Sequence, residues 1–414
     1  MNFWVLLLAA CSAPEPAVES ESATDVHAAA VPAPVSLAVI PAIEWRVASE
    51  AMRSPAATPG DEALAAARAQ LLTVVTQHAR DPNNPWAIGH GMLALGKDTV
   101  LTNDKGAVDH LFAAYGEEIT VGDETLIRFP TSRGDIRVEP HADLILKVLT
   151  EVGVQPNRAV VVAGNAHTVG DLYRGSLARA WVGDGSETGF ASWNDSPWAL
   201  QGLAAYGPEE LTWTAEGGHA MTLDSFTSLS VSKLRSETAF LREAIANNTT
   251  VEKRRQFIFD YTCGGSHFYQ GAAYAVGRGY GTDEDRALVA YELGVYFWRA
   301  SSELAQLDSL MRSQPDYAPL LLEQRLKFTG HLLESAHKTW ALGVATPTAE
   351  ELVLIDVLRT QVVATVQAID ALGIWDRLED VRAADEQVYL DYVGDSAHAL
   401  RALDLSTGEG VIYR

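Results

Sequence analysis

One short segment combines two residue types that often bind transition metals. Cys263 and His267 stand four residues apart in TCGGSHFYQG, with two glycines between them. Residues four apart share one face of a helix, and thiolate sulfur with imidazole nitrogen suits zinc. The paired glycines permit an unusual turn before the helix. The spacing indicates a zinc site, and the structural alternative is a buried thiol with histidines bonded to helix caps.

Further histidines recur at the expected starts of apolar helices. His331, in TGHLLES, is the expected third metal ligand, and His141, in EPHADLILKVL, is the expected catalytic acid or base, or else a fourth ligand. His90 and His398 hold similar places. A helix N-terminus carries the positive end of the helix dipole, which favours a thiolate. Zinc is therefore the expected cofactor, activating a thiolate or a water molecule.

The elements that must position these residues are mostly helical, because apolar residues after position 60 recur with a period near 3.6. Two kinds of helix alternate. Amphipathic helices are expected over 61–80, 222–245 and 349–372, and helices that are apolar on more sides are expected to begin near residues 84, 139, 196, 263, 329 and 396.

This alternation predicts an all-α fold, an α/α toroid of about six helical hairpins, because neither helix of a pair can bury its apolar face alone. Inner helices of such a ring point their starts at one mouth, where the histidines would converge. The segment 119–129 predicts a small β-hairpin insertion around Gly122 and Asp123. A helical bundle or solenoid is the alternative architecture.

The N-terminal segment MNFWVLLLAAC predicts a lipoprotein signal peptide over residues 1–11, with Cys11 as the lipidated cysteine of a lipobox. Residues 12–60 are rich in Ala and Pro and predict a tether, within which the more apolar stretch Val35 to Met52 is expected to lie against the domain. Residues 61–414 form the predicted domain. The expected partner is the membrane, reached through the lipid, in the bacterial cell envelope and by preference at the outer membrane.

Composition disfavours one class of partner and excludes an intrachain disulfide at Cys263. The formal net charge is −23, which disfavours nucleic acid because binding phosphates needs a basic footprint. The chain has two cysteines. With Cys11 assigned to lipid, Cys263 has no partner for an intrachain disulfide.

The order of four motifs resembles a group of uncharacterised bacterial α/α-toroid proteins, best represented in planctomycetes. The motifs are Pro85-Trp86 with His90-Gly91, a histidine at His141, Cys263 to His267, and Thr329 to His331. Ser266 stands where that group has threonine. The wider class resembles terpene cyclases, protein prenyltransferases and lanthionine cyclases, and the last two imply a catalytic zinc held by Cys and His. The acid motif Asp-x-Asp-Asp of squalene cyclases is missing.

Two other functions remain open from the sequence. The first is a carbohydrate-active (α/α)6 enzyme, which needs two carboxylates roughly 5–9.5 Å apart, with Asp143 and Asp224 as candidates. The second is a lipid-anchored scaffold without catalytic activity. Convergence of Cys and His rather than carboxylates at the mouth of the ring separates the zinc hypothesis from both.

Overall fold

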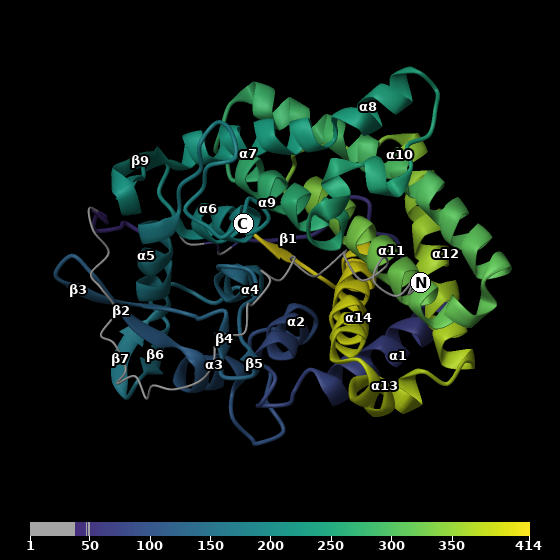
Figure 1. Cartoon of the computed structure of the whole chain (residues 1–414), viewed down its shortest axis with the longest axis horizontal. Coiled ribbons are helices and arrows are strands. Elements are labelled where there is room, and N and C mark those ends of the chain that lie inside the picture. Colours follow the sequence, from purple (N-terminus) through teal and green to yellow (C-terminus); the bar gives the residue numbers. More distant parts are fainter. Residues whose placement is uncertain (1–37, 47, 49) are drawn as a thin grey trace, which may run out of the picture.

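The structure is a computed structural model that describes residues 38–46, 48 and 50–414. The predicted signal peptide, the lipidation site at Cys11 and the first part of the predicted tether lie outside these residues. Within the described part the chain is mostly helical, with fourteen α-helices and several short two-stranded sheets. Figure 1 shows hairpins gathered with α3 and α5 on one side, and long helices on the other.

Six helices are buried on most sides and correspond to the six apolar helices expected from the sequence. They are α2 (Pro85–Leu95), α4 (Leu144–Glu151), α6 (Ser196–Tyr206), α9 (Ser266–Gly277), α11 (Ala318–Ala341) and α14 (Glu386–Thr407). Each packs against the next in this order, and α14 packs back against α2. This set of contacts brings together residues from helices that are far apart in the sequence.

The remaining helices cover this buried set. They are α1 (Glu62–His78), α3 (Ala107–Tyr115), α5 (Val169–Arg179), α7 (Leu223–Glu237), α8 (Ala239–Ala246), α10 (Asp283–Ser313), α12 (Ala349–Ala371) and α13 (Leu378–Ala384). The three predicted amphipathic helices are confirmed as α1, α7 with α8, and α12, with one interruption at Thr238. Helix α10 packs on both α9 and α11, so it reaches the back of the segment that carries Cys263.

Of the described helices, one, α12, is long and apolar enough to span a membrane. It packs against α11 and α1. Its buried stripe includes Ile355, Leu358, Val362, Val366 and Ile369. Amphipathic burial of this kind matches a helix that covers a protein core.

The predicted hairpin is confirmed as β2 (Glu117–Val121) and β3 (Glu124–Arg128), with Gly122 in the turn at φ +59°. Three further hairpins were not expected: β4 (Ser132–Arg133) with β5 (Ile136–Arg137), β6 (Ala159–Val162) with β7 (Asn165–Thr168), and β8 (Thr212–Ala215) with β9 (His219–Thr222). The all-α description is therefore too simple. Strands this short leave little periodicity for a sequence to reveal.

Described residues between 38 and α1 contact the domain at several points. Val39 forms a β-bridge with Thr214, and β1 (Ala51–Met52) pairs with β10 (Ile412–Tyr413). The ring of Trp45 meets that of Tyr173 edge to face at 5.2 Å. The expectation that the stretch up to Met52 lies against the domain is thus confirmed for its described part, while the boundary at residue 60 stays a prediction.

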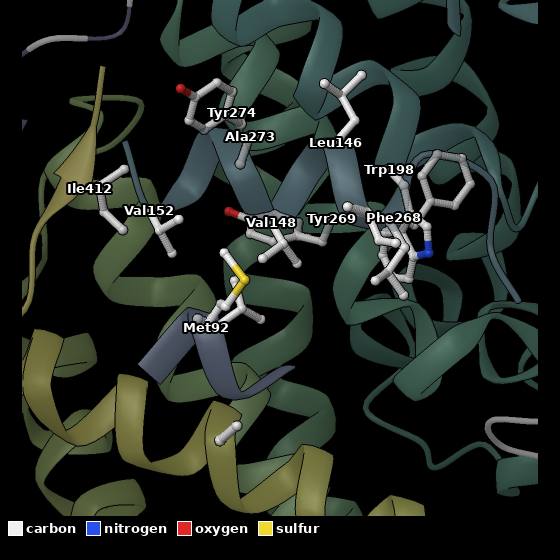
Figure 2. Packing of buried hydrophobic residues seen from close by; sticks show 14 of the residues in the cluster. Met92, Leu146, Val148, Val152, Trp198, Phe268, Tyr269, Ala273, Tyr274 and Ile412 are labelled. Atoms are coloured by element: carbon white, nitrogen blue, oxygen red, sulfur yellow. The ribbon is translucent and has the colours of Figure 1, made fainter. Parts of the chain in front are cut away.

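The core runs continuously between the buried helices, and Figure 2 shows part of it, with Met92, Val148, Trp198 and Tyr269 among the labelled side chains. Helices α6 and α9 approach closely at Gly271, where a Cβ atom would lie 2.6 Å from the backbone oxygen of Pro197. A larger residue there would push α9 away from α6. The Cys-Gly-Gly segment, residues 263–265, comes directly before the start of α9.

Candidate metal centre

A left-handed turn presents Cys263. The 3₁₀ segment Thr262–Gly265 precedes α9, and Cys263, Gly264 and Gly265 have φ angles of +52°, +63° and +81°. Cys263 therefore lies outside the helix, so the prediction that it shares a helical face with His267 is wrong. The glycines adopt this conformation without the steric cost that a Cβ atom adds.

Helix α10 holds the turn in place. The Tyr296 hydroxyl donates to the Gly265 carbonyl at 2.8 Å, and Arg299 Nη1 donates to the Gly264 carbonyl at 2.6 Å. Arg299 is itself paired with Glu303 at 2.6 Å. A Cβ atom on Gly264 would lie 2.9 Å from Arg299 Nη2. The turn and the buried guanidinium therefore require a glycine at this position.

The three residues predicted as metal ligands come together. One ligand atom each of Cys263, His267 and His331 lies within 4.8 Å of the others, so the cluster could hold a metal ion. His267 comes from the first turn of α9, and His331 from α11. Both imidazoles are buried and Cys263 is 8% exposed.

Hydrogen bonding orients the ring of His331. Its Nδ1 donates to the Lys327 carbonyl at 2.8 Å, so Nε2 carries the lone pair of the neutral ring and is the nitrogen within hydrogen-bond distance of His267. That Nε2 lies 3.2 Å from Nε2 of His267. Burial lowers the pKa of both histidines well below 6.5, and neighbouring imidazoles or lysines lower it further. Both rings are therefore neutral at pH 7, as metal ligation requires.

The histidines do not converge at helix starts, contrary to the prediction from the sequence. His331, His398 and His90 lie inside α11, α14 and α2 rather than at helix starts. Of the five histidines placed near helix starts, His267 stands in a first turn and His141 precedes α4. Convergence results from the packing of helix sides, so a helix dipole acts at His267 alone among the three ligands.

A histidine–carboxylate pair borders the cluster. His398 Nδ1 donates to Glu334 Oε2 at 2.7 Å, and its ring lies 4.0 Å from that of His331. Its Nε2 is buried and has no hydrogen-bond partner among the described residues. An imidazole fixed at one nitrogen and unpaired at the other can accept or donate a proton beside the cluster. Sequence reasoning noted His398 but missed Glu334.

Glu334 belongs to a buried network of five charged side chains. Lys338 pairs with Glu334 at 3.1 Å and also with Glu151, Lys147 pairs with Glu151 at 3.1 Å, and Arg401 pairs with Glu334 at 3.2 Å. The signal for it was present in the sequence: Lys147 with Glu151, and Glu334 with Lys338, stand at i, i+4 on otherwise apolar helices.

The network keeps its carboxylates ionised. Burial by itself would raise the pKa of Glu334, but Lys338, His398 and Arg401 together hold it well below 4.5. Burial lowers the pKa of Lys147 to about 8 despite the attraction of Glu151. At neutral pH, Glu334 is therefore an anion that accepts the Nδ1–H of His398.

His141, the predicted catalytic residue, lies beside the cluster and outside the ligand set. Its Nδ1 is 3.0 Å from Asp195 Oδ1, and its Nε2 is 3.2 Å from the hydroxyl of Thr262, the residue before Cys263. Trp198 separates it from His267, contacting both rings edge to face. Asp195, which precedes α6, was missed. The acid–base role of His141 stays a prediction.

A small pocket opens at Cys263. It has a volume of about 20 Å³ and is also lined by Lys253, Arg299, Lys327 and Phe328. A space of roughly 10–15 Å³ accommodates one water molecule. Cys263 therefore lines a water-sized space together with three cationic side chains and the carboxylate of Glu303.

The two carboxylates considered for a glycan-cleaving enzyme serve other contacts. Asp143 accepts from the Ser176 hydroxyl and from Arg179, both at 2.8 Å. Asp224 Oδ1 accepts from the backbone N–H of Gly281 at 2.8 Å. Both groups support local structure, and Cys and His side chains, not this pair, form the cluster.

Comparisons of the chain with protein-family models, with curated proteins and with solved structures found no match. The candidate centre therefore rests on its own geometry.

Replacing Gly264 by Ala tests the turn. Gly264→Ala adds a Cβ atom at positive φ and against Arg299, so we expect a loss of roughly 2–3 kcal/mol in the free energy of unfolding. Gly218→Ala is the matched control, because Gly218 has φ +85° with open space around its Cβ position, and about 1 kcal/mol is expected. Equal losses in urea unfolding would contradict the close contact with Arg299.

Proposed function

We propose that the protein is a zinc-dependent hydrolase whose metal is bound by Cys263, His267 and His331. The observation that carries this proposal is the convergence of one thiol and two neutral imidazoles within 4.8 Å. Three protein ligands are typical of catalytic zinc sites, whereas structural sites usually have four.

The donor set fits zinc on two counts. Two nitrogens bound to one tetrahedral zinc ion at about 2.05 Å are about 3.3 Å apart, and the two Nε2 atoms lie 3.2 Å apart. Sulfur and nitrogen together favour zinc over magnesium or calcium, which prefer oxygen. The hydrogen bond from His331 Nδ1 to a backbone carbonyl is the outer contact that metal-binding histidines usually make.

His398 is the proposed acid–base group next to this site. Bound zinc supplies Lewis acidity and lowers the pKa of water at an open coordination position. Two ligands of one ion with bonds of 2.0–2.3 Å are at most about 4.6 Å apart. The group of ligand atoms that lie within 4.8 Å of one another does not include a nitrogen of His398, so His398 is not assigned as a ligand. Its unpaired Nε2 can instead receive a proton, while Glu334 stabilises the resulting imidazolium.

We extend the proposal to the architecture and location expected from the sequence. The contacts of the six buried helices, with α14 against α2, support an α/α toroid, and an experimental structure with this closed order of helices would test it. Membrane attachment through Cys11 in the bacterial envelope rests on the lipobox segment. His141, held by Asp195, is the second candidate for proton transfer.

Metal content tests the site directly. The full chain purified without chelators should contain about one zinc per chain, and the Cys263→Ser and His331→Ala variants should lose most of it, because each removes one of three ligands. His219→Gln, at an exposed histidine, should keep the metal. Atomic emission or mass spectrometry measures this. A folded wild-type protein that binds no zinc after exposure to the ion would overturn the proposal.

Replacing His398 separates ligation from proton transfer. His398→Gln should retain zinc but hydrolyse a chromogenic ester, p-nitrophenyl acetate, about 100-fold more slowly, since a positioned acid–base group contributes roughly 10²–10⁴. His219→Gln is again the matched control. Loss of zinc from His398→Gln would identify His398 as a ligand, and unchanged hydrolysis would remove it from the mechanism.

The two cysteines provide a matched test of membrane attachment. In a bacterial host fed labelled palmitate, the wild-type chain and Cys263→Ser should incorporate the label, and Cys11→Ser should not. The reason is that lipidation acts on the cysteine that ends the lipobox. Equal labelling of Cys11→Ser and the wild type, or no label in either, would contradict a lipid anchor at Cys11.

A further inference from the structure

A second, larger pocket is connected to the histidine cluster through a series of stacked and edge-on rings. It has a volume of about 130 Å³ and forms where the start of α2, the β5 strand, α13 and the start of α14 meet. Its lining includes Trp86, whose ring stacks on that of His90 at 3.8 Å. The ring of His90 in turn lies edge-on to that of His398 at 5.5 Å. Trp86 and His90 therefore connect this pocket to the proposed acid–base group.

The position of Trp86 depends on a glycine of the opposite helix. A Cβ atom on Gly394 of α14 would lie 2.5 Å from Cη2 of Trp86 and 3.2 Å from His90. The absence of a side chain at residue 394 lets the tryptophan occupy the floor of the pocket. Leu390 and Asn84 complete that floor, and both are buried. Asn84 Oδ1 caps α2 by accepting from Ala87 N, so its amide nitrogen is the group that can bind a ligand.

The charges around the pocket balance. Two cations, Arg137 and Arg382, stand with two anions, Asp135 and Glu386. Both cations have contacts already, because Arg137 donates to Gln387 at 2.5 Å and Arg382 lies over the ring of Tyr389. A phosphate or carboxylate ligand would find no excess positive charge here. An apolar ligand would leave the amide and charged groups without partners.

We propose that this pocket binds a neutral sugar unit of a glycan. A sugar ring offers apolar C–H groups for contact with an aromatic ring such as Trp86 and hydroxyls that donate to carboxylates and accept from amides and guanidinium groups. A few polar groups around an aromatic floor are typical of small-molecule sites. The pocket lies on the far side of Trp86 and His90 from His398, so as a substrate subsite it rests on the proposed hydrolase function, although binding itself needs no metal.

Calorimetric titration of the full chain tests this inference. The probes are tetra-N-acetylchitotetraose, cellotetraose and maltotetraose, with inorganic phosphate for comparison. We expect saturable binding of at least one saccharide, weakened about tenfold by Trp86→Leu and about threefold by Glu386→Gln. Glu350→Gln on α12, an exposed glutamate outside the pocket, is the matched control and should bind like the wild type.

A folding check, a second variant and a titration without zinc separate the possible outcomes. Circular dichroism checks that Trp86→Leu folds, and Glu386→Gln at the exposed rim gives an independent readout if it does not. No saturable binding of any saccharide, binding of phosphate alone, or full affinity in both pocket variants would overturn the inference. Titrations repeated after zinc removal should give the same affinity. A protein found to bind no zinc could therefore still be tested for sugar binding. A protein found to bind no sugar would keep the same zinc content.

Discussion

The buried charges between α4, α11 and α14 constrain the rest of the structure most strongly. Glu151 and Glu334 lie among Lys147, Lys338 and Arg401, all of them nearly inaccessible to solvent. Removing one member of a buried ion pair costs about 3–5 kcal/mol because the remaining charge loses its partner. These helices can therefore neither slide nor rotate relative to one another without that cost. Since His331, Glu334 and His398 stand on the same helices, the network also fixes where their side chains meet.

A second constraint acts on the cysteine from outside the buried helices. Three successive residues with positive φ form its turn, and α10 holds two of their carbonyls through Tyr296 and Arg299. The covering helix α10 thus orients the turn that carries Cys263, whereas His331 is positioned by the buried helix α11. Their relative position depends on the packing of α10 against α9 and α11. A cluster assembled in this way needs the complete domain, because no local segment contains all three of its residues.

The sequence predicted the helices, one hairpin and the three residues that cluster, because periodicity and residue type are local properties. It did not predict why they converge. Helical spacing was the argument for Cys263 and His267, but the glycines between them place Cys263 in a left-handed turn. Glu334 and His398 are 64 residues apart and Lys338 and Glu151 are 187 apart, so only the packed structure shows these pairs. The i, i+4 charge pairs on apolar helices are the signal that could have revealed the network.

The strap of residues before α1 has a mechanical consequence. Its β1 strand pairs with β10, and Glu50 and Arg414 exchange two backbone hydrogen bonds of 3.1 and 2.9 Å at the edge of that pair. Tension applied to the chain at residue 38 would meet the bridge from Val39 to Thr214 first, and then the short β1–β10 pair. These contacts would yield before any force reached α1. Detachment of these described residues would therefore leave the helices that carry His267 and His331 unstrained, and the β1–β10 pair joins the segment before α1 to the C-terminal strand.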